Sequence, residues 1–304
     1  MNITLLDGGN GQEIYLRSNK PAHPLWSVKV MLDNPNIVTK VHDDFIKSGS
    51  KIICLNTYTA TYSRLKRDGK VEWFKKAHEI AISCAKKSID RNRLKFPNIQ
   101  ISGCLPPLVA SYKPETTRSY EECLDEYSKI VEIQEQNVDF FLAETMSTIL
   151  EAKSAIDATK YFNKKLLVSF TLDDNKVGFL RSGESLKDAI LEIQNCDVEG
   201  ILLNCSSVET IDKSIDIFKN SNKRFGAYAN GFTTIQGLNP GGTVDVLSAR
   251  KDLIPSKYSK YILNWIKKGV TIIGGCCEIG PNHIKQIYTD LKFKKYNITN
   301  LNLD

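Results

Sequence analysis

Three cysteines follow two apolar runs of this sequence in a pattern that suits a metal ion. Cys205 ends the run Leu202-Leu203-Asn204-Cys205, and Cys276 and Cys277 follow Ile272-Ile273-Gly274-Gly275. Three thiolates with one open position form a catalytic rather than a structural zinc site, and soft sulfur selects zinc over magnesium or calcium. The spacing alone leaves two other interpretations open. The cysteines would then be small core residues, or the adjacent pair a fortuitous one or a strained disulfide.

The elements that must position these thiols follow from the apolar pattern. Short runs rich in Ile, Leu, Val or Phe are typical of strands buried on both faces of a parallel sheet. We expect strands over Ile3–Asp7, Lys51–Asn56, Ile99–Gly103, Asp139–Glu144, Leu166–Thr171, Gly200–Cys205, Arg224–Ala229 and Val270–Gly274.

Amphipathic stretches separate these runs. We expect helices over Asn36–Ser48, Val71–Ile89, Tyr120–Gln136, Ile149–Tyr161, Ser185–Asn195, Val208–Asn220, Ser256–Lys268 and Asn282–Leu291. About eight strand–helix units in this length predict an α/β fold, a single (β/α)8 TIM barrel. A doubly wound open sheet is the alternative. We expect the barrel over residues 1–292 and a polar, loose C-terminal tail over 293–304.

In such a barrel the carboxyl ends of the strands share one face, and that face carries the chemistry. The expected strand ends hold Asp7, Glu144, Cys205 and the Cys276-Cys277 pair, together with Cys104 and Asn230. Polar and thiol side chains therefore gather where a site would form, which agrees with the metal interpretation.

Composition narrows the classes of function. Charged residues make up 25% of the 304 residues, the net charge is +6, and no arginine-rich stripe appears, so a nucleic-acid partner is not favoured. No apolar run reaches the length that spans a membrane, and no leader with a cleavage site opens the chain. We expect a cytoplasmic protein with reduced cysteines. The sequence does not predict the oligomeric state.

Several segments carry a resemblance to a known family. Asp7-Gly8-Gly9, Asn56 to Tyr62, Glu144-Thr145, Asn204-Cys205 and Gly274-Gly275-Cys276-Cys277 occur in the order seen in homocysteine S-methyltransferases. These include S-methylmethionine-using enzymes, betaine–homocysteine methyltransferase and the homocysteine module of methionine synthase. The resemblance spans nearly the whole chain. It implies a zinc barrel with Zn2+ held by Cys205, Cys276 and Cys277.

The resemblance also implies roles for other residues at the strand ends. Asp7 and Glu144 resemble the family acids that bind the ammonium group of homocysteine, although a turn-forming Asp and a helix N-terminal Glu are the structural alternatives. The amides of Gly8 and Gly9 would meet the carboxylate of the substrate. Asn230 would donate a hydrogen bond at the mouth or form a turn with Gly231.

A sulfonium donor would suit an aromatic box through cation–π attraction. Aromatic residues near the expected strand ends are Tyr58, Tyr62, Phe170, Tyr228 and Phe232, for most of which core packing is the alternative. Cys104 tops the third strand as a candidate fourth thiol, whereas Cys54, Cys84, Cys123 and Cys196 read as packing residues.

The sequence departs from the family in three loops. Glu278-Ile279-Gly280-Pro281 follows the paired cysteines, Asn230-Gly231-Phe232 follows the seventh strand, and Cys104-Leu105-Pro106-Pro107 ends the third. These loops lie on the donor side of the barrel mouth. They leave the zinc cysteines intact, but the roles of Cys104 and Glu278 are not predicted.

The favoured function is zinc-dependent transfer of a methyl group from a small sulfonium, S-methylmethionine or S-adenosylmethionine, to homocysteine, giving methionine. One alternative is methyl transfer to another thiol or selenol. Another is a zinc-holding barrel without transferase activity that binds a ligand or partner.

Overall fold

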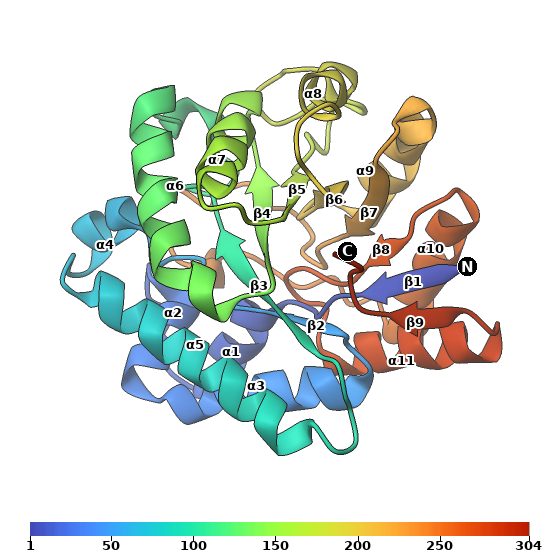
Figure 1. The fold of residues 1–304 in the computed structure, drawn as a ribbon, viewed down its shortest axis with the longest axis horizontal. Coiled ribbons are helices and arrows are strands. Elements are labelled where there is room, and N and C mark those ends of the chain that lie inside the picture. The colour runs from blue at the N-terminus through green and yellow to red at the C-terminus, as the bar shows by residue number, and fades with distance from the viewer. Residues whose placement is uncertain (304) are drawn as a thin grey trace.

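The chain folds into a barrel of parallel strands that is surrounded by helices (Figure 1). The computed structural model describes residues 1–303, leaving aside the side chains of residues 219 and 220. The strands are β1 (Asn2–Leu5), β2 (Ile52–Cys54), β3 (Gln100–Leu105), β4 (Phe140–Met146), β5 (Leu166–Phe170), β6 (Gly200–Asn204), β7 (Arg224–Tyr228), β8 (Ile272–Ile273) and β9 (Asn297–Thr299).

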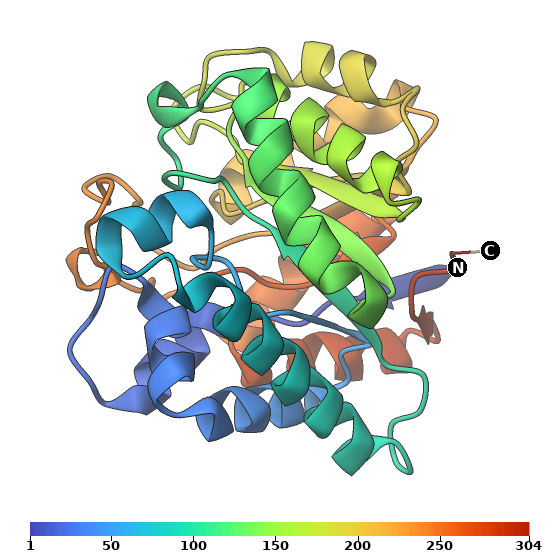
Figure 2. The same cartoon turned by 60° about the vertical axis from the view of Figure 1, so that its left-hand side comes forward.

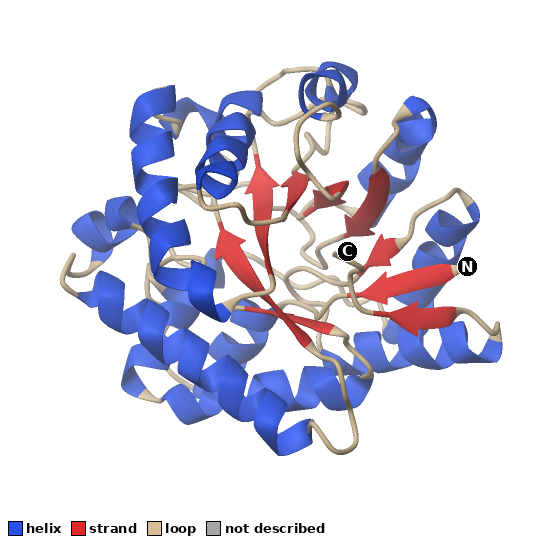
Figure 3. Ribbon diagram, viewed as in Figure 1, coloured by secondary structure: helices blue, strands red, loops and turns tan. Residues whose placement is uncertain are grey.

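The helices lie outside the ring of strands, as Figure 3 shows. They are α1 (Asn10–Ser18), α2 (Trp26–Asp33), α3 (Pro35–Ser48), α4 (Tyr62–Asp68), α5 (Trp73–Asn92), α6 (Tyr120–Gln134), α7 (Ile149–Tyr161), α8 (Leu186–Ile193), α9 (Val208–Ser214), α10 (Pro255–Lys267) and α11 (Pro281–Phe293). Within the described chain, none of these helices combines the length and the apolar character that a membrane crossing requires.

The strand order confirms the expected barrel. Strands β2 to β8 pair in sequence order, and β8 then pairs with β1. A hydrogen bond from the Lys51 amide to the Leu5 carbonyl, 2.8 Å long, joins the chain entering β2 to the end of β1. A doubly wound sheet would reverse its order in the middle, so that alternative is wrong. All eight expected strands form, with ends shifted by a few residues.

Side chains alternate between two apolar layers, as the pleat of a strand requires. The inner layer fills the barrel axis with residues such as Ile52, Leu142, Leu202 and Ile272. The outer layer packs the strands against the helices. Ser185 caps α8 by accepting a hydrogen bond from the Asp188 amide, and Pro281 begins α11 one residue before the expected start.

The C-terminal segment differs from the loose end that we expected. Strand β9 pairs in parallel with β1, with Asn297 opposite Asn2. Leu301 is buried and belongs to the inner layer, and the Gln100 side chain bonds the Leu301 backbone in both directions. Figure 2 shows the described part of this segment beside the N-terminus. Residue 304 lies outside the described residues.

Candidate metal centre and cavity

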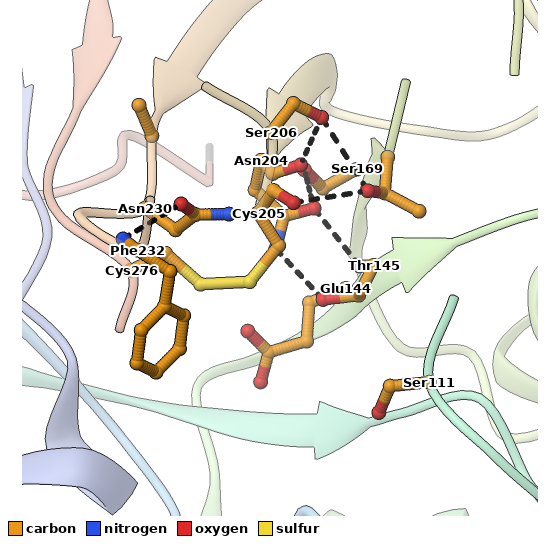
Figure 4. Close-up of a disulfide and its surroundings, with 12 residues drawn as sticks. Ser111, Glu144, Thr145, Ser169, Asn204, Cys205, Ser206, Asn230, Phe232 and Cys276 are labelled. Atoms are coloured by element: carbon orange, nitrogen blue, oxygen red, sulfur yellow. Dashed lines mark hydrogen bonds between the residues drawn. A yellow bond between two sulfur atoms is a disulfide. The ribbon is translucent and has the colours of Figure 1, made fainter. Parts of the chain in front are cut away.

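The three cysteines lie together at the carboxyl ends of the barrel strands. Cys205 directly follows β6, and Cys276 and Cys277 follow β8 after two glycines. The three sulfur atoms lie within 4.8 Å of one another. Cys205 and Cys276 form a disulfide with their Cα atoms 5.7 Å apart, whereas Cys277 is free (Figure 4). The chain thus brings together the sulfurs that the sequence pattern had grouped, with two of them in the oxidised state.

Backbone hydrogen bonds fix the loop that carries Cys276 and Cys277. The Gly275 amide donates to the Asp7 carbonyl at 3.0 Å, and the Cys276 amide donates to the Ala229 carbonyl at 3.0 Å. The Gly231 amide in turn donates to the Cys277 carbonyl at 2.8 Å. The loop after β8 is therefore tied to the ends of both neighbouring strands.

A side-chain network holds the loops on the other side of the disulfide, as Figure 4 shows. The buried Asn204 side chain accepts from the Thr145 amide at 2.9 Å and from the Ser169 hydroxyl at 2.8 Å. Its amide group donates to the Thr145 hydroxyl at 2.9 Å. Thr145 and Cys205 both have positive backbone φ angles, of 64° and 46°, which residues other than glycine rarely adopt. Asn204 therefore fixes the backbone beside both Glu144 and Cys205.

The turn after β1 needs its two glycines because it packs against the cysteine loop. A Cβ atom on Gly8 would lie 2.1 Å from the Ile279 carbonyl oxygen, and one on Gly9 would lie 2.4 Å from the Cys276 carbonyl oxygen. The Gly9 amide, which we expected to meet a substrate carboxylate, donates to the Ile279 carbonyl at 2.9 Å. Its observed role is to hold the two loops together.

Asp7 and Glu144 line the same cavity as the cysteines. The Asp7 carboxylate accepts from the Cys54 amide at 2.9 Å. Burial raises the pKa of Asp7 to about 8, against this hydrogen bond and with help from the Glu144 charge. Burial likewise raises the pKa of Glu144 to about 7, although hydrogen bonds from the Cys104 and Cys54 thiols favour its charged form. A cationic ligand group would favour ionisation of both acids.

The sequence interpretation missed Cys54 at this site. Cys54 was expected to be a packing residue, but it lines the cavity, with its sulfur 3.9 Å from Glu144 Oε1. The Cys104 sulfur lies 3.2 Å from the same oxygen and groups with Cys54 and Glu144 rather than with the other three cysteines. Alternation along β2 was the available signal, because Ile52 points into the barrel and Cys54 lies two residues further on.

Aromatic side chains form part of the cavity wall. Of the five that we named, the cavity is lined by Tyr58, Tyr228 and Phe232, and the sequence interpretation missed Trp26 and Tyr112. Tyr62 stacks on Phe74 with the ring centroids 4.1 Å apart, and Phe170 belongs to the outer apolar layer. For these two residues the structure favours the packing alternative.

Asn230 and Glu278 make local contacts. The Asn230 side chain accepts from the Phe232 amide at 3.1 Å, which is the turn that the sequence left as an alternative. Glu278 accepts from the Gln12 side chain at 2.7 Å and has a positive φ angle of 65°. Glu278 therefore links the cysteine loop to α1.

The donor chemistry of the three cysteines fits zinc. Reduction of the disulfide would leave three thiols directed at one region, buried or half-buried, beside a cavity from which a fourth ligand can approach. Burial, together with the charges of Glu278 and Glu144, raises the pKa of the Cys277 thiol to about 12. A bound cation would reverse this effect, because coordination deprotonates a thiol.

The chain is similar to proteins of a known family over nearly its whole length. A sequence model of the family described as homocysteine S-methyltransferase matches residues 4–291. Homocysteine S-methyltransferase 2 of Zea mays is 25% identical over 94% of this chain and 89% of its own length. Selenocysteine methyltransferase of Astragalus bisulcatus is 24% identical over 93% and 91%.

A solved structure shares the fold. The homocysteine methyltransferase MmuM from Escherichia coli, in its metallated form, superposes with a TM-score of 0.80 at 21% identity. The match covers 95% of this chain and 96% of that one.

Proposed function

Because the chain belongs to the homocysteine S-methyltransferase family, we propose that it transfers a methyl group from a small sulfonium donor to the thiol of homocysteine, with zinc held by Cys205, Cys276 and Cys277. The observation that carries the proposal is the convergence of the three sulfurs beside a cavity that also holds two acids. When bound, zinc supplies a positive charge that keeps the acceptor sulfur deprotonated and nucleophilic near neutral pH.

The acids supply the polar end of the acceptor site. The carboxylates of Asp7 and Glu144 bind the acceptor ammonium, which favours their ionised forms and opposes the effect of burial. The acceptor therefore lies with its ammonium group on these acids and its sulfur toward the cysteines. The protein therefore mainly orients the two substrates, which is a large part of catalysis when no protein nucleophile takes part.

The aromatic wall supplies the donor side. Tyr58 and Phe232 line the cavity. Aromatic faces attract a sulfonium and also exclude water from the reacting groups. We propose S-methylmethionine or S-adenosylmethionine as the donor, with Asn230 supporting the mouth through the turn to Phe232.

The test combines metal analysis with a donor panel. Reduced wild-type protein should hold close to one equivalent of zinc at the three cysteines and form methionine from homocysteine with one of the two sulfonium donors. Cys276→Ser should lose most of the metal and of the activity, whereas Cys123→Ser, at a free buried cysteine on α6, should keep both. Methylation by metal-free protein would reject the mechanism.

A selenol acceptor is the second candidate. The similarity to a selenocysteine methyltransferase favours testing it. Selenocysteine and homocysteine should be compared by kcat/KM in the same assay. If kcat/KM is higher for selenocysteine, selenocysteine becomes the proposed acceptor in place of homocysteine. The proposal of the zinc site would not change.

A further inference from the structure

A second group of metal-ligating side chains lies in the same barrel, apart from the three cysteines. Cys54 ends β2, Cys104 lies on β3 and Glu144 lies on β4, so three consecutive strands contribute one ligand each. Their ligand atoms lie within 4.8 Å of one another. Cys54 and Cys104 lie on regular strand, which holds side chains more firmly than a loop does. Glu144 lies where the pairing of β4 with β5 is irregular, and the hydrogen bonds between Asn204 and Thr145 fix the backbone beside it.

The separations suit a tetrahedral ion. With metal–sulfur bonds of about 2.3 Å and metal–oxygen bonds of about 2.1 Å, a tetrahedral centre places sulfur and oxygen roughly 3.6 Å apart. Glu144 Oε1 lies 3.2 Å from the Cys104 sulfur and 3.9 Å from the Cys54 sulfur. The two distances fall on either side of that value, so small side-chain rotations would seat an ion.

Two buried hydroxyl groups beside this cluster lack a partner. The hydroxyls of Ser102 and Tyr228 line the cavity, and neither makes a hydrogen bond of regular geometry among the described residues, although Ser102 lies near the Cys54 thiol and Tyr228 near the Ser169 hydroxyl. The nearby Ser169 hydroxyl donates to Asn204 rather than to Tyr228. Buried polar groups without partners are rare, and water bound to an ion would supply one.

We propose that Cys54, Cys104 and Glu144 form a second site for a thiophilic divalent cation, of the zinc and cadmium class. Two sulfurs and one carboxylate favour such an ion over magnesium or calcium. Binding releases the thiol protons to solvent and forms two metal–sulfur bonds and one metal–oxygen bond, with no change of oxidation state.

The second site has a consequence that rests on the proposed function. Glu144 is also the acid that we assign to the acceptor ammonium, and a divalent cation bound to its carboxylate would repel that ammonium. A cation held there would therefore compete with homocysteine, and excess zinc would raise the apparent KM for homocysteine while kcat stays the same.

Cadmium titration of the fully reduced protein tests the site directly. The thiolate-to-cadmium absorption band should saturate at about two equivalents in the wild type. It should saturate at about one equivalent in Cys54→Ser/Cys104→Ser, and at about one in Cys205→Ser/Cys276→Ser. Cys84→Ser/Cys123→Ser, which removes two free buried cysteines outside the cavity, should behave as the wild type. If the double variant does not fold, the single variant Cys54→Ser provides the same test, because Cys54 is only half-buried.

The outcomes separate the two proposals. Equal cadmium stoichiometry in the wild type and in the folded Cys54 variants would overturn the second site. A second equivalent that depends on Cys54 and Cys104 would establish it, even in a protein that methylates no acceptor. Zinc inhibition that is competitive with homocysteine and is lost in Cys54→Ser would support both proposals. A second equivalent without such competition would keep the site and reject Glu144 as the ammonium ligand.

Discussion

The hydroxyl of Tyr258 donates a 2.8 Å hydrogen bond to the carbonyl of Gly274. The Tyr258 hydroxyl oxygen also accepts a hydrogen bond from the Ala229 amide at 3.1 Å. One fully buried side chain on α10 thus links the end of β7 to the loop that carries Cys276 and Cys277. The position of these two cysteines depends on a residue that does not touch them.

Tyr258→Phe should lower both stability and metal affinity. The substitution keeps the ring packing but leaves a buried amide and a buried carbonyl without a partner, which costs about 1–3 kcal/mol. Denaturant unfolding and competition for zinc with a chelator would measure the two effects. Tyr261→Phe is the control, because its hydroxyl lies 3.4 Å from Glu209 at the surface. Unchanged zinc affinity in Tyr258→Phe would show that the loop holds its shape by other contacts.

Gly9→Ala should displace the cysteine loop. The added Cβ would lie 2.4 Å from the Cys276 carbonyl oxygen and 2.9 Å from the Cys277 Cα atom, and neither is the mobile end of a side chain. We expect a loss of about 1–3 kcal/mol of stability, with weaker zinc binding. Gly280→Ala is the matched control, since its Cβ would meet only the Glu13 carboxylate, which can move. Wild-type zinc affinity in Gly9→Ala would contradict the close packing of the two loops.

Binding of the amino-acid group should weaken as the pH falls. The raised pKa values of Asp7, about 8, and Glu144, about 7, mean that the free protein holds protons on these acids near neutral pH. An ammonium ligand needs the ionised forms, so binding must release protons. The affinity should fall as the pH drops below about 8, where Asp7 takes up its proton, and more steeply below about 7, where Glu144 does so too. The Cys54 and Cys104 thiols also face Glu144 and remain protonated over this range, since burial raises the pKa of Cys104 and the pKa of Cys54 is raised as well.

Calorimetry with methionine would test this pH dependence, because methionine carries the ammonium and carboxylate but has no thiol proton to lose. Titrations in buffers with different ionisation enthalpies give the number of protons released. Glu144→Gln should release fewer protons than the wild type. An affinity that does not change between about pH 6 and pH 8 would show that the two acids do not bind the ammonium.

His42 should make the protein sensitive to mild acid. Its side chain on α3 is fully buried, and neither ring nitrogen has a hydrogen-bond partner in the part of the chain that the structure describes. Burial lowers the pKa of His42 from 6.5 to about 4, although the neighbouring Asp43 opposes the shift. Because the unfolded chain binds the proton more readily, this contribution to stability is complete above about pH 6.5 and is lost as the pH falls toward 4.

The effect of His42 amounts to up to about 3 kcal/mol between these limits. Unfolding free energies measured at several pH values should fall less steeply in His42→Leu than in the wild type. His78, which is also buried with a pKa of about 4, stays in both proteins and provides the common background. Equal pH dependence in the two proteins would place the sensitivity elsewhere.

Apolar runs predicted the eight barrel strands because each is buried on both faces. Helices such as α10, with one apolar face, were equally visible. Three helices and β9 were not predicted. Helix α4 has only seven residues, Tyr62–Asp68, and most of them are polar. Strand β9 has only three residues and forms because β1 offers it an edge to pair with, which no local pattern reveals.

The candidate site was predictable to the extent that barrel topology decides it. The strand-end rule brought Cys205 close to Cys276 although 71 residues separate them. The direction of a side chain at a strand end depends on the register of that strand. The sequence therefore did not predict that Cys54 faces the cavity. The network around Asn204 depends on backbone angles at Thr145 and Cys205 that emerge only in the folded chain.

Strand β9 and Leu301 give the molecule a plugged base. Leu301 packs in the same inner layer as Ile52 and Leu142, which form the floor beneath Cys54 and Glu144. The cavity is thus closed at its base, and its exposed lining residues include Asn239 and Gly242. A molecule bound to the buried Asp7 and the half-buried Glu144 would lie deeper in the cavity than one bound near the exposed Asn239.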